Sequence, residues 1–153
     1  AGYPHFRKDK VLFQSQDLAP AQRDELLRQL SDSNKVSAVI LLAHGSPDPE
    51  AAQETHELRD ALSALRPDWR FDVAFLNHEP KLDHAVESLM TMGCTHIRIL
   101  PLLVFKGKHL REDIPALVST LRSRLPKLQL ELQPHLSQLP GFREILLRTL
   151  ENS

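Results

Sequence analysis

Short apolar runs alternate along this chain with longer stretches in which apolar residues occupy only one face. The runs are rich in Val, Ile and Leu, with the near-continuous or alternating pattern of strands covered by other elements. In the stretches between them, apolar residues recur every three or four positions, as in a helix with one buried side. The pattern predicts strands at 36–43, 70–76, 96–104 and 128–134, and helices at 49–65, 81–90, 110–125 and 140–150.

Regular alternation of strands and helices predicts an α/β fold. Short connections between the elements favour a mostly parallel sheet of four to five strands with helices on both faces. Pro101 lies inside the third strand, where it removes a ladder hydrogen bond and indicates a sheet edge, a bulge or the end of the strand. Ligands of such sheets bind beyond the carboxyl ends of the strands. The informative loops are therefore 44–48, 77–81 and 105–113.

The first 35 residues do not share this pattern. Residues 1–18 show no period and predict an extended arm, whereas 19–31 predict a helix with Pro20 in its first turn. The polar segment 31–34 predicts a break. We divide the chain into an N-terminal arm and helix of unassigned role, residues 1–35, and an α/β domain, residues 36–153.

Composition narrows the class of protein. The net charge of the 153 residues is −1, so no global basic field is available to hold nucleic acid or an anionic membrane. No apolar run approaches the roughly 18 residues of a membrane span. Cys94 is the single cysteine, which excludes an intramolecular disulfide and a cysteine metal cluster and suits a reducing compartment. These features predict a cytoplasmic protein without nucleic-acid or membrane partners.

Four of the eight histidines follow the carboxyl end of a predicted strand: His44, His78, His109 and His135. His44 ends an aliphatic run and is followed by Gly45, so it is either a turn residue or a side chain presented to the ligand cleft. The predicted parallel sheet favours the cleft, because that is the edge where ligands bind.

His109 lies among three cations, Lys106, Lys108 and Arg111, at a predicted helix start. Cations at that end oppose the helix dipole, so the cluster indicates a bound anion more than a stabilised helix. His44 and His109 together predict two imidazoles facing one cavity, which suits cobalt, nickel, iron or zinc. Two ligands without cysteine form an open site, suited to passing a metal on.

Other motifs with a known chemistry are absent from the sequence. No G-x-G-x-x-G, P-loop or G-x-S-x-G occurs, so nucleotide-binding and nucleophile-elbow functions lack support. A phosphohistidine phosphatase needs an arginine directly before its histidine, where this chain has Ala43. No nucleotide cofactor is expected.

Four segments in order carry a resemblance to a known family: the strand ending in His44-Gly45-Ser46, then 74–80, 99–103 and 107–115. Together they resemble the small class II tetrapyrrole chelatases, the sirohydrochlorin cobaltochelatase and ferrochelatase family of the CbiX and SirB type. The resemblance covers about residues 36–150. It implies ATP-independent insertion of cobalt or iron into sirohydrochlorin, in cobalamin or siroheme biosynthesis, and half of a two-lobed fold that is completed by a homodimer. The same imidazoles would also bind nickel, so the sequence does not choose the metal.

The resemblance also implies roles for residues. His44 and His109 match the two metal-binding histidines of the family, and Asn77 replaces an expected glutamate. Glu79, the one carboxylate of its loop, is then the candidate acid–base group. Sirohydrochlorin carries eight carboxylates, and the cations that could bind them are Lys106, Lys108, Arg111 and Lys81. The flexible ring also needs apolar walls, for which the candidates are Leu103, Val104 and Phe105.

A second function stays open. Asn77 could mark the loss of a catalytic acid, in which case the chain is a non-catalytic carrier of metal or tetrapyrrole derived from the chelatase fold. Multiple turnover separates the two functions, because a carrier stops at one equivalent.

Overall fold

The computed structural model describes residues 19–33 and 37–153, and the chain divides into two compact units, residues 1–35 and 36–153. In the first unit, helix α2 spans Pro20–Ser33, two residues beyond the predicted end, so residues 31–33 of the predicted break at 31–34 are helical and residue 34 lies outside the described residues. The N–H of Ala19 donates to Gln22 Oε1 at 3.2 Å and caps the helix start. The extended arm predicted at 1–18 lies outside the described residues.

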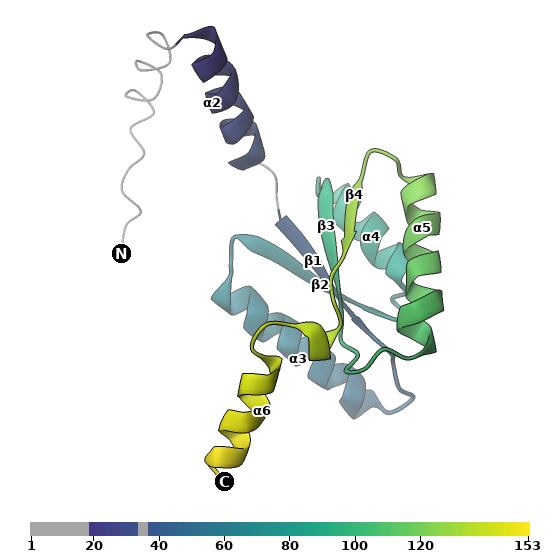
Figure 1. Ribbon diagram of the computed structural model, residues 1–153. Coiled ribbons are helices and arrows are strands. Elements are labelled where there is room, and N and C mark those ends of the chain that lie inside the picture. Colours follow the sequence, from purple (N-terminus) through teal and green to yellow (C-terminus); the bar gives the residue numbers. More distant parts are fainter. Residues whose placement is uncertain (1–18, 34–36) are drawn as a thin grey trace. The chain divides into compact units, whose positions relative to one another are not determined.

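The second unit is built on one sheet of four parallel strands in the order β2-β1-β3-β4 (Figure 1). The strands are β1 Ser37–Ala43, β2 Trp69–Phe75, β3 His96–Pro101 and β4 Gln129–Leu132. The predicted parallel α/β fold is confirmed. Pro101 is the last residue of a central strand, so the third of the alternatives, the strand's end, is correct and residues 102–104 lie outside the strand.

Helices cover both faces of the sheet (Figure 1). Helix α3 (Pro49–Leu65) packs Ala52 and Leu62 against one side of β1 and β2. Helices α4 (Leu82–Thr91) and α5 (Ile114–Arg124) pack against the other side. Residues 38–42 of β1 are all buried, because the strand is central and covered on both faces. This explains its continuous apolar sequence.

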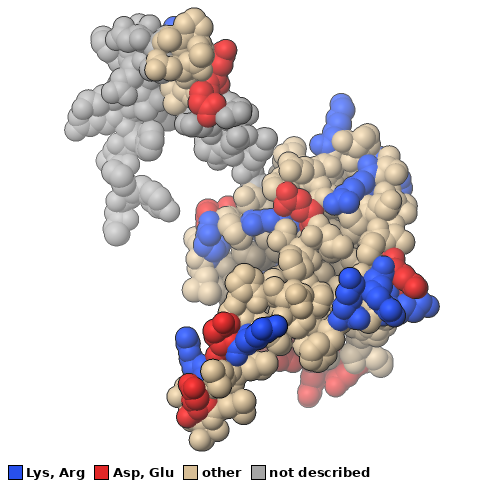
Figure 2. Space-filling model, in the orientation of Figure 1, with Lys and Arg blue, Asp and Glu red and all other residues tan. Residues whose placement is uncertain are grey.

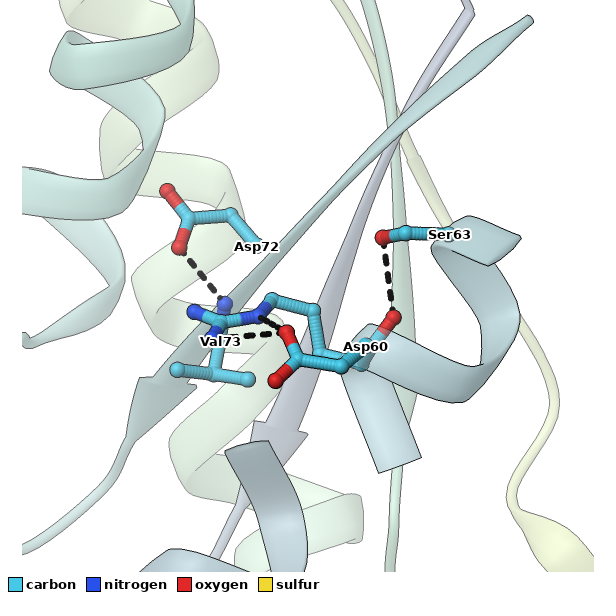
Figure 3. Close-up of polar contacts among 5 residues, drawn as sticks. Asp60, Ser63, Asp72 and Val73 are labelled. Carbon is cyan, nitrogen blue, oxygen red and sulfur yellow. Dashed lines mark hydrogen bonds and ion pairs between the residues drawn. The ribbon is translucent and has the colours of Figure 1, made fainter. Parts of the chain in front are cut away.

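Polar contacts of α3 and β2 are local (Figure 3). Arg59 pairs with the adjacent Asp60 at 2.9 Å, and the hydroxyl of Ser63 donates to the carbonyl of Arg59. In β2, the N–H of Val73 donates to the neighbouring Asp72 carboxylate at 2.8 Å. Each contact joins residues close in sequence, so apolar burial supplies the attachment of α3 to the sheet.

Two short turns and one helix complete the unit. A π-helical turn, His109–Asp113, precedes α5 where the sequence predicts the first turns of an α-helix, and a 3₁₀ turn, Leu136–Gln138, follows β4. Helix α6 (Phe142–Glu151) starts at Gly141 and leads away from the sheet (Figure 1). Among the helices of the described segments, none is long and apolar enough to cross a membrane.

Candidate metal centre

The site begins where β1 ends. His44 directly follows Ala43, and Gly45 adopts a positive φ of 91° that turns the chain away from the sheet. A Cβ at Gly45 would lie 2.7 Å from Cδ2 of His78, so only glycine lets the two loops approach this closely. The turn presents His44 at the carboxyl edge of the sheet.

The same loop then starts α3 with a conventional cap. The N–H of Asp48 donates to Ser46 Oγ at 3.1 Å, and the Asp48 carboxylate accepts from the N–H of Glu50 at 3.0 Å. Pro49 lies in the first turn of α3, where backbone N–H groups have no partner within the helix, so proline's lack of an N–H costs no hydrogen bond. Ser46, Pro47 and Asp48 therefore have structural roles in this loop, and His44 is its candidate metal ligand.

The loop after β2 is held against this turn by backbone hydrogen bonds. The N–H of Leu76 donates to the carbonyl of Ala43 at 3.0 Å, and the N–H of Asn77 to that of His44 at 3.1 Å. These bonds extend the β1–β2 pairing past the strands and bring the Asn77 amide to 3.3 Å from Nδ1 of His44. Asn77 is thus the side chain of its loop that contacts a predicted metal ligand.

The loop after β3 contributes His109 through the π-helical turn. The N–H of Ile114 donates to the carbonyl of His109, five residues back, which widens the turn. Nδ1 of His109 lies 2.8 Å from Oδ2 of Asp113. Sequence reasoning left Asp113 without a role. The signal was the spacing of four residues, which places two side chains on one helical face.

The two histidines meet. Nε2 of His44 and Nε2 of His109 are 3.1 Å apart, with the rings edge to face at 4.8 Å between centroids. A carboxylate only accepts, so Asp113 fixes the proton of His109 on Nδ1 and leaves a lone pair on its Nε2. Nδ1 of His44 lies 3.1 Å from the carbonyl oxygen of Gly45 and 3.3 Å from the amide nitrogen of Asn77. A carbonyl only accepts, so a proton on Nδ1 of His44 that is donated to Gly45 leaves a lone pair on Nε2 of His44 as well, beside that of His109.

The separation of the two nitrogens fits one shared metal ion. Two imidazole nitrogens at about 2.0–2.1 Å from a divalent ion are about 2.9 Å apart at an octahedral angle and about 3.3 Å apart at a tetrahedral one. The observed 3.1 Å lies between these values. Within residues 19–33 and 37–153, no group of three or more His, Cys, Asp or Glu side chains is placed to hold a metal. The pair is therefore an open two-ligand arrangement.

A cavity of about 410 Å³ opens beside this pair. Its walls combine polar groups of the site with apolar side chains of α5, a mixture typical of small-molecule sites. The lining residues are Leu76, Asn77, His109, Asp113, Ala116, Leu117 and Thr120.

The Glu79 carboxylate contacts His84, whereas an acid–base role at the metal would place it beside His44 and His109. The carboxylate lies 2.7 Å from Nδ1 of His84 and 3.1 Å from the backbone N–H of Lys81, and it lines a neighbouring cavity. The hydrogen bond from His84 lowers the pKa of Glu79, which makes the carboxylate a weaker base. The helical pattern of the sequence predicts that His84 is a solvated residue. In the structure His84 forms an ion pair with Glu79.

The predicted substrate-binding cations are exposed. Lys106, Lys108 and Arg111 lie between β3 and α5, and no ion pair joins them to an acid within the described ranges. Figure 2 shows Lys and Arg side chains gathered, with acidic ones beside them, over the end of the domain from which α5 starts. Phe105 is 76% exposed, unusual for an aromatic side chain in a small domain.

The other strand-end histidines do not contact this pair. His78 packs beside Gly45 with its ring 6.3 Å from that of Phe75, and its Nε2 is buried without a hydrogen-bond partner among the described residues. His135 precedes the 3₁₀ turn after β4. Of the four histidines, the structure brings together His44 and His109.

The structure is thus a parallel α/β domain with an open pair of histidines, a candidate metal site, at the carboxyl edge of its sheet. The family model described as CbiX matches residues 38–153, and the chain belongs to the CbiX family.

Curated relatives carry chelatase names. The sirohydrochlorin ferrochelatase of Bacillus subtilis is 29% identical over 94 residues, 61% of this chain and 36% of that protein. The sirohydrochlorin cobaltochelatase of Saccharolobus solfataricus is 34% identical over 80 residues, 52% of this chain and 62% of that protein. The chain thus spans about one third to two thirds of the length of these relatives.

Solved structures share the fold. A CbiX protein from Marinobacter aquaeolei VT8 superposes with a TM-score of 0.62 at 26% identity, covering 76% of this chain and 99% of that one. The sirohydrochlorin chelatase SirB from Bacillus subtilis subspecies spizizenii, in complex with cobalt, gives a TM-score of 0.66 at 23% identity and covers 76% of this chain and 50% of that one.

Proposed function

We propose that this protein inserts a divalent metal, cobalt or iron, into sirohydrochlorin without a nucleotide. The observation that carries the proposal is the pair of Nε2 atoms 3.1 Å apart, at the spacing of two ligands of one ion. Membership of a family whose relatives are named sirohydrochlorin chelatases supports the reaction. The relatives include both a ferrochelatase and a cobaltochelatase, and the proposed reaction would serve cobalamin or siroheme biosynthesis.

The two histidines would serve in turn as ligands and as bases. Insertion of a divalent ion releases two protons from the pyrrole nitrogens of the ring. An imidazole that transfers its metal regains a lone pair, and at near-neutral pKa that lone pair can accept a proton. His44 and His109 together can therefore exchange one metal ion for two protons. This balances the reaction without a further group.

Asp113 would orient His109 for this exchange. Its carboxylate holds the Nδ1 proton and directs Nε2 toward the metal, as carboxylate partners of metal-binding histidines commonly do. Glu79 lines the neighbouring cavity, and its ion pair with His84 makes its carboxylate a weaker base for the pyrrole protons. Its acid–base role stays a prediction.

Lys106, Lys108 and Arg111 would attract the acidic rim of the substrate, and Phe105 would form an apolar wall for the ring. All four side chains are exposed beside the turn that carries His109. Charge-assisted contacts between such cations and carboxylates are the strongest hydrogen bonds available to an open site.

A homodimer would close the site. Helix α6 exposes Ile145, Leu146, Leu147 and Leu150, between 50% and 71% each, and none of its residues is buried. An amphipathic helix of this kind is stable when its apolar face is covered. A second copy of the chain could cover α6 and place a second domain over the open histidine pair.

Anaerobic mixing of the protein with sirohydrochlorin and cobalt(II) or iron(II), followed by absorbance, tests the proposal. We expect many equivalents of metallated product per protein chain. Sedimentation velocity tests the dimer: the wild type should sediment as a dimer and a Leu146→Asp/Leu150→Asp variant as a monomer. A monomeric wild type would contradict the dimer while leaving the chemistry to the absorbance assay.

The contact of Asn77 with His44 favours a second candidate function, that of a metal or tetrapyrrole carrier. An amide beside a metal ligand cannot take up a proton, whereas a carboxylate at the same place could. A carrier would bind one equivalent of metal and release no excess product. The same absorbance assay separates the two functions by the number of turnovers.

A further inference from the structure

A second cavity, of about 460 Å³, lies beside the one at the histidine pair. The two cavities share Leu76, Leu117 and Thr120 in their walls. A ligand in the first cavity therefore lies next to the second one, across side chains that belong to both walls.

Helix α5 connects the two cavities along one face. Asp113, Leu117, Thr120 and Arg124 follow one another at spacings of four, three and four residues, which places them in a single stripe. At 1.5 Å of rise per residue, the stripe extends roughly 16 Å along the helix axis. One end is at the histidine pair and the other is in the second cavity.

The second cavity combines an apolar floor with basic side chains. Phe75, Leu82 and Leu121 are buried and form the floor. Lys81, His84 and Arg124 stand at its wall.

The acids around this cavity already have partners. Glu79 accepts from His84 and from the N–H of Lys81, which raises the pKa of His84 and favours its charged form. Asp83 accepts from the N–H of His84 at 2.9 Å, and Glu87 lies 3.4 Å from Arg124. The ammonium of Lys81 has no ion-pair partner in the part of the chain that the structure describes. Lys81 is thus the basic group of this cavity that has no acidic partner for its side chain among the described residues, and Arg124 holds only a long 3.4 Å contact with Glu87, which a substrate carboxylate could replace.

We propose that this cavity is a second binding subsite, which holds an acidic side chain of the tetrapyrrole while the ring lies at His44 and His109. The apolar floor takes the methylene groups, and Lys81 and Arg124, with His84 beside them, bind the carboxylate. The subsite rests on the proposed function and adds a specificity determinant to it. Tetrapyrroles with more acidic groups on the rim bind more tightly than those with few.

Direct binding of metal-free porphyrins, followed by fluorescence quenching, tests the subsite. The probes are an octacarboxylic and a dicarboxylic porphyrin, and the variants are Lys81→Ala and Arg124→Ala. Lys127→Ala is the matched control, because it removes one exposed positive charge that lines neither cavity. We expect Kd for the octacarboxylic probe to rise about tenfold in Lys81→Ala and Arg124→Ala, as for loss of a bond to a charged group, and to stay unchanged in the control.

Cobalt binding, measured by calorimetry without porphyrin, should be the same in all four proteins. If Lys81→Ala and Arg124→Ala bind the octacarboxylic probe as tightly as Lys127→Ala does, the subsite is overturned and the proposed function stands. If the wild type binds cobalt and neither porphyrin, the proposed function falls, and the subsite falls with it. Equal melting temperatures among the variants exclude loss of folding as the cause of weaker binding.

Discussion

Nε2 of His44 lies 3.1 Å from Nε2 of His109, although 65 residues separate the two positions in the chain. The contact arises because β1 and β3 are adjacent parallel strands, whose carboxyl ends lie at one edge of the sheet. His44 follows β1 directly, and His109 stands eight residues after β3, on a π-helical turn. The meeting of the two histidines at the candidate metal centre is therefore a consequence of strand order.

Replacement of either histidine should abolish metal insertion. We expect His44→Ala and His109→Ala each to lower cobalt affinity by more than about 100-fold, because loss of a ligand exceeds the 10–100-fold effect of outer-shell partners. The fold should survive, since both residues lie outside the core. His135→Ala, another strand-end histidine, serves as the control in calorimetry and in the turnover assay. Turnover near the wild-type rate in either variant would rule out the assignment.

Replacement of Asp113 should weaken the site without removing a ligand. We expect Asp113→Ala to lower cobalt affinity by about 10–100-fold, and Asp113→Asn to recover part of that loss because its amide oxygen can still accept from Nδ1 of His109. Glu112→Ala removes the same charge one residue away and should bind cobalt normally. Equal affinities of Asp113→Ala and Glu112→Ala, measured by calorimetry, would show that Asp113 does not position His109.

A side chain at Gly45 should disturb both stability and the site. The positive φ strains any other residue there, and a Cβ would lie 2.7 Å from the His78 ring. We expect Gly45→Ala to lower the free energy of unfolding by about 1–3 kcal/mol and to reduce cobalt affinity. Urea denaturation measures the first effect. Gly93 also has a positive φ but nothing within 4 Å of a built Cβ, so Gly93→Ala separates backbone strain from the clash with His78.

The His84–Glu79 pair should be detectable by titration. The Glu79 carboxylate raises the pKa of His84 above its ordinary 6.5, and the His84 hydrogen bond lowers the pKa of Glu79 below its ordinary 4.5. The contribution of His84 to stability is complete below pH 6.5 and is lost as the pH rises through its raised pKa. That of Glu79 is complete above pH 4.5 and is lost as the pH falls through its lowered pKa. The pair therefore contributes fully between about pH 4.5 and 6.5.

NMR titration of the histidine ring protons checks this prediction. In Glu79→Gln, His84 should titrate at a lower pH than in the wild type. The same variant tests the predicted acid–base role: a turnover rate that collapses while cobalt affinity is kept would support Glu79 as the base. An unchanged rate would leave the two histidines to accept the protons unaided.

Neutralisation of the basic cluster should weaken substrate binding. We expect a variant with Lys106, Lys108 and Arg111 changed to Gln to raise the KM for sirohydrochlorin about tenfold at low salt, since exposed charge pairs contribute roughly 0.2–1 kcal/mol each. Wild-type KM should rise with ionic strength, and the variant should respond less. A variant that loses thermal stability but keeps wild-type KM would show that the cluster serves the fold.

The local sequence determined the elements and the edge of the sheet where chemistry occurs. The near-continuous apolar run at 36–43 predicts a strand covered on both faces, and in the structure residues 38–42 are all buried. Repeated strand–helix units then require a parallel sheet, which places His44 and His109 at one edge. Periodicity and strand ends are local properties of the chain, so these features could be predicted without coordinates.

Tertiary structure decided which side chains meet. Asn77 reaches His44 because backbone bonds continue the β1–β2 pairing beyond the strands, and Asp113 reaches His109 because a π-helical turn replaces the first turn of α5. Glu79 and His84 pair with each other beside a separate cavity. The contacts of His44 with His109 and with Asn77 join segments far apart in sequence, so no periodicity in the chain encodes them. The spacing of four residues between His109 and Asp113 is, by contrast, a local signal.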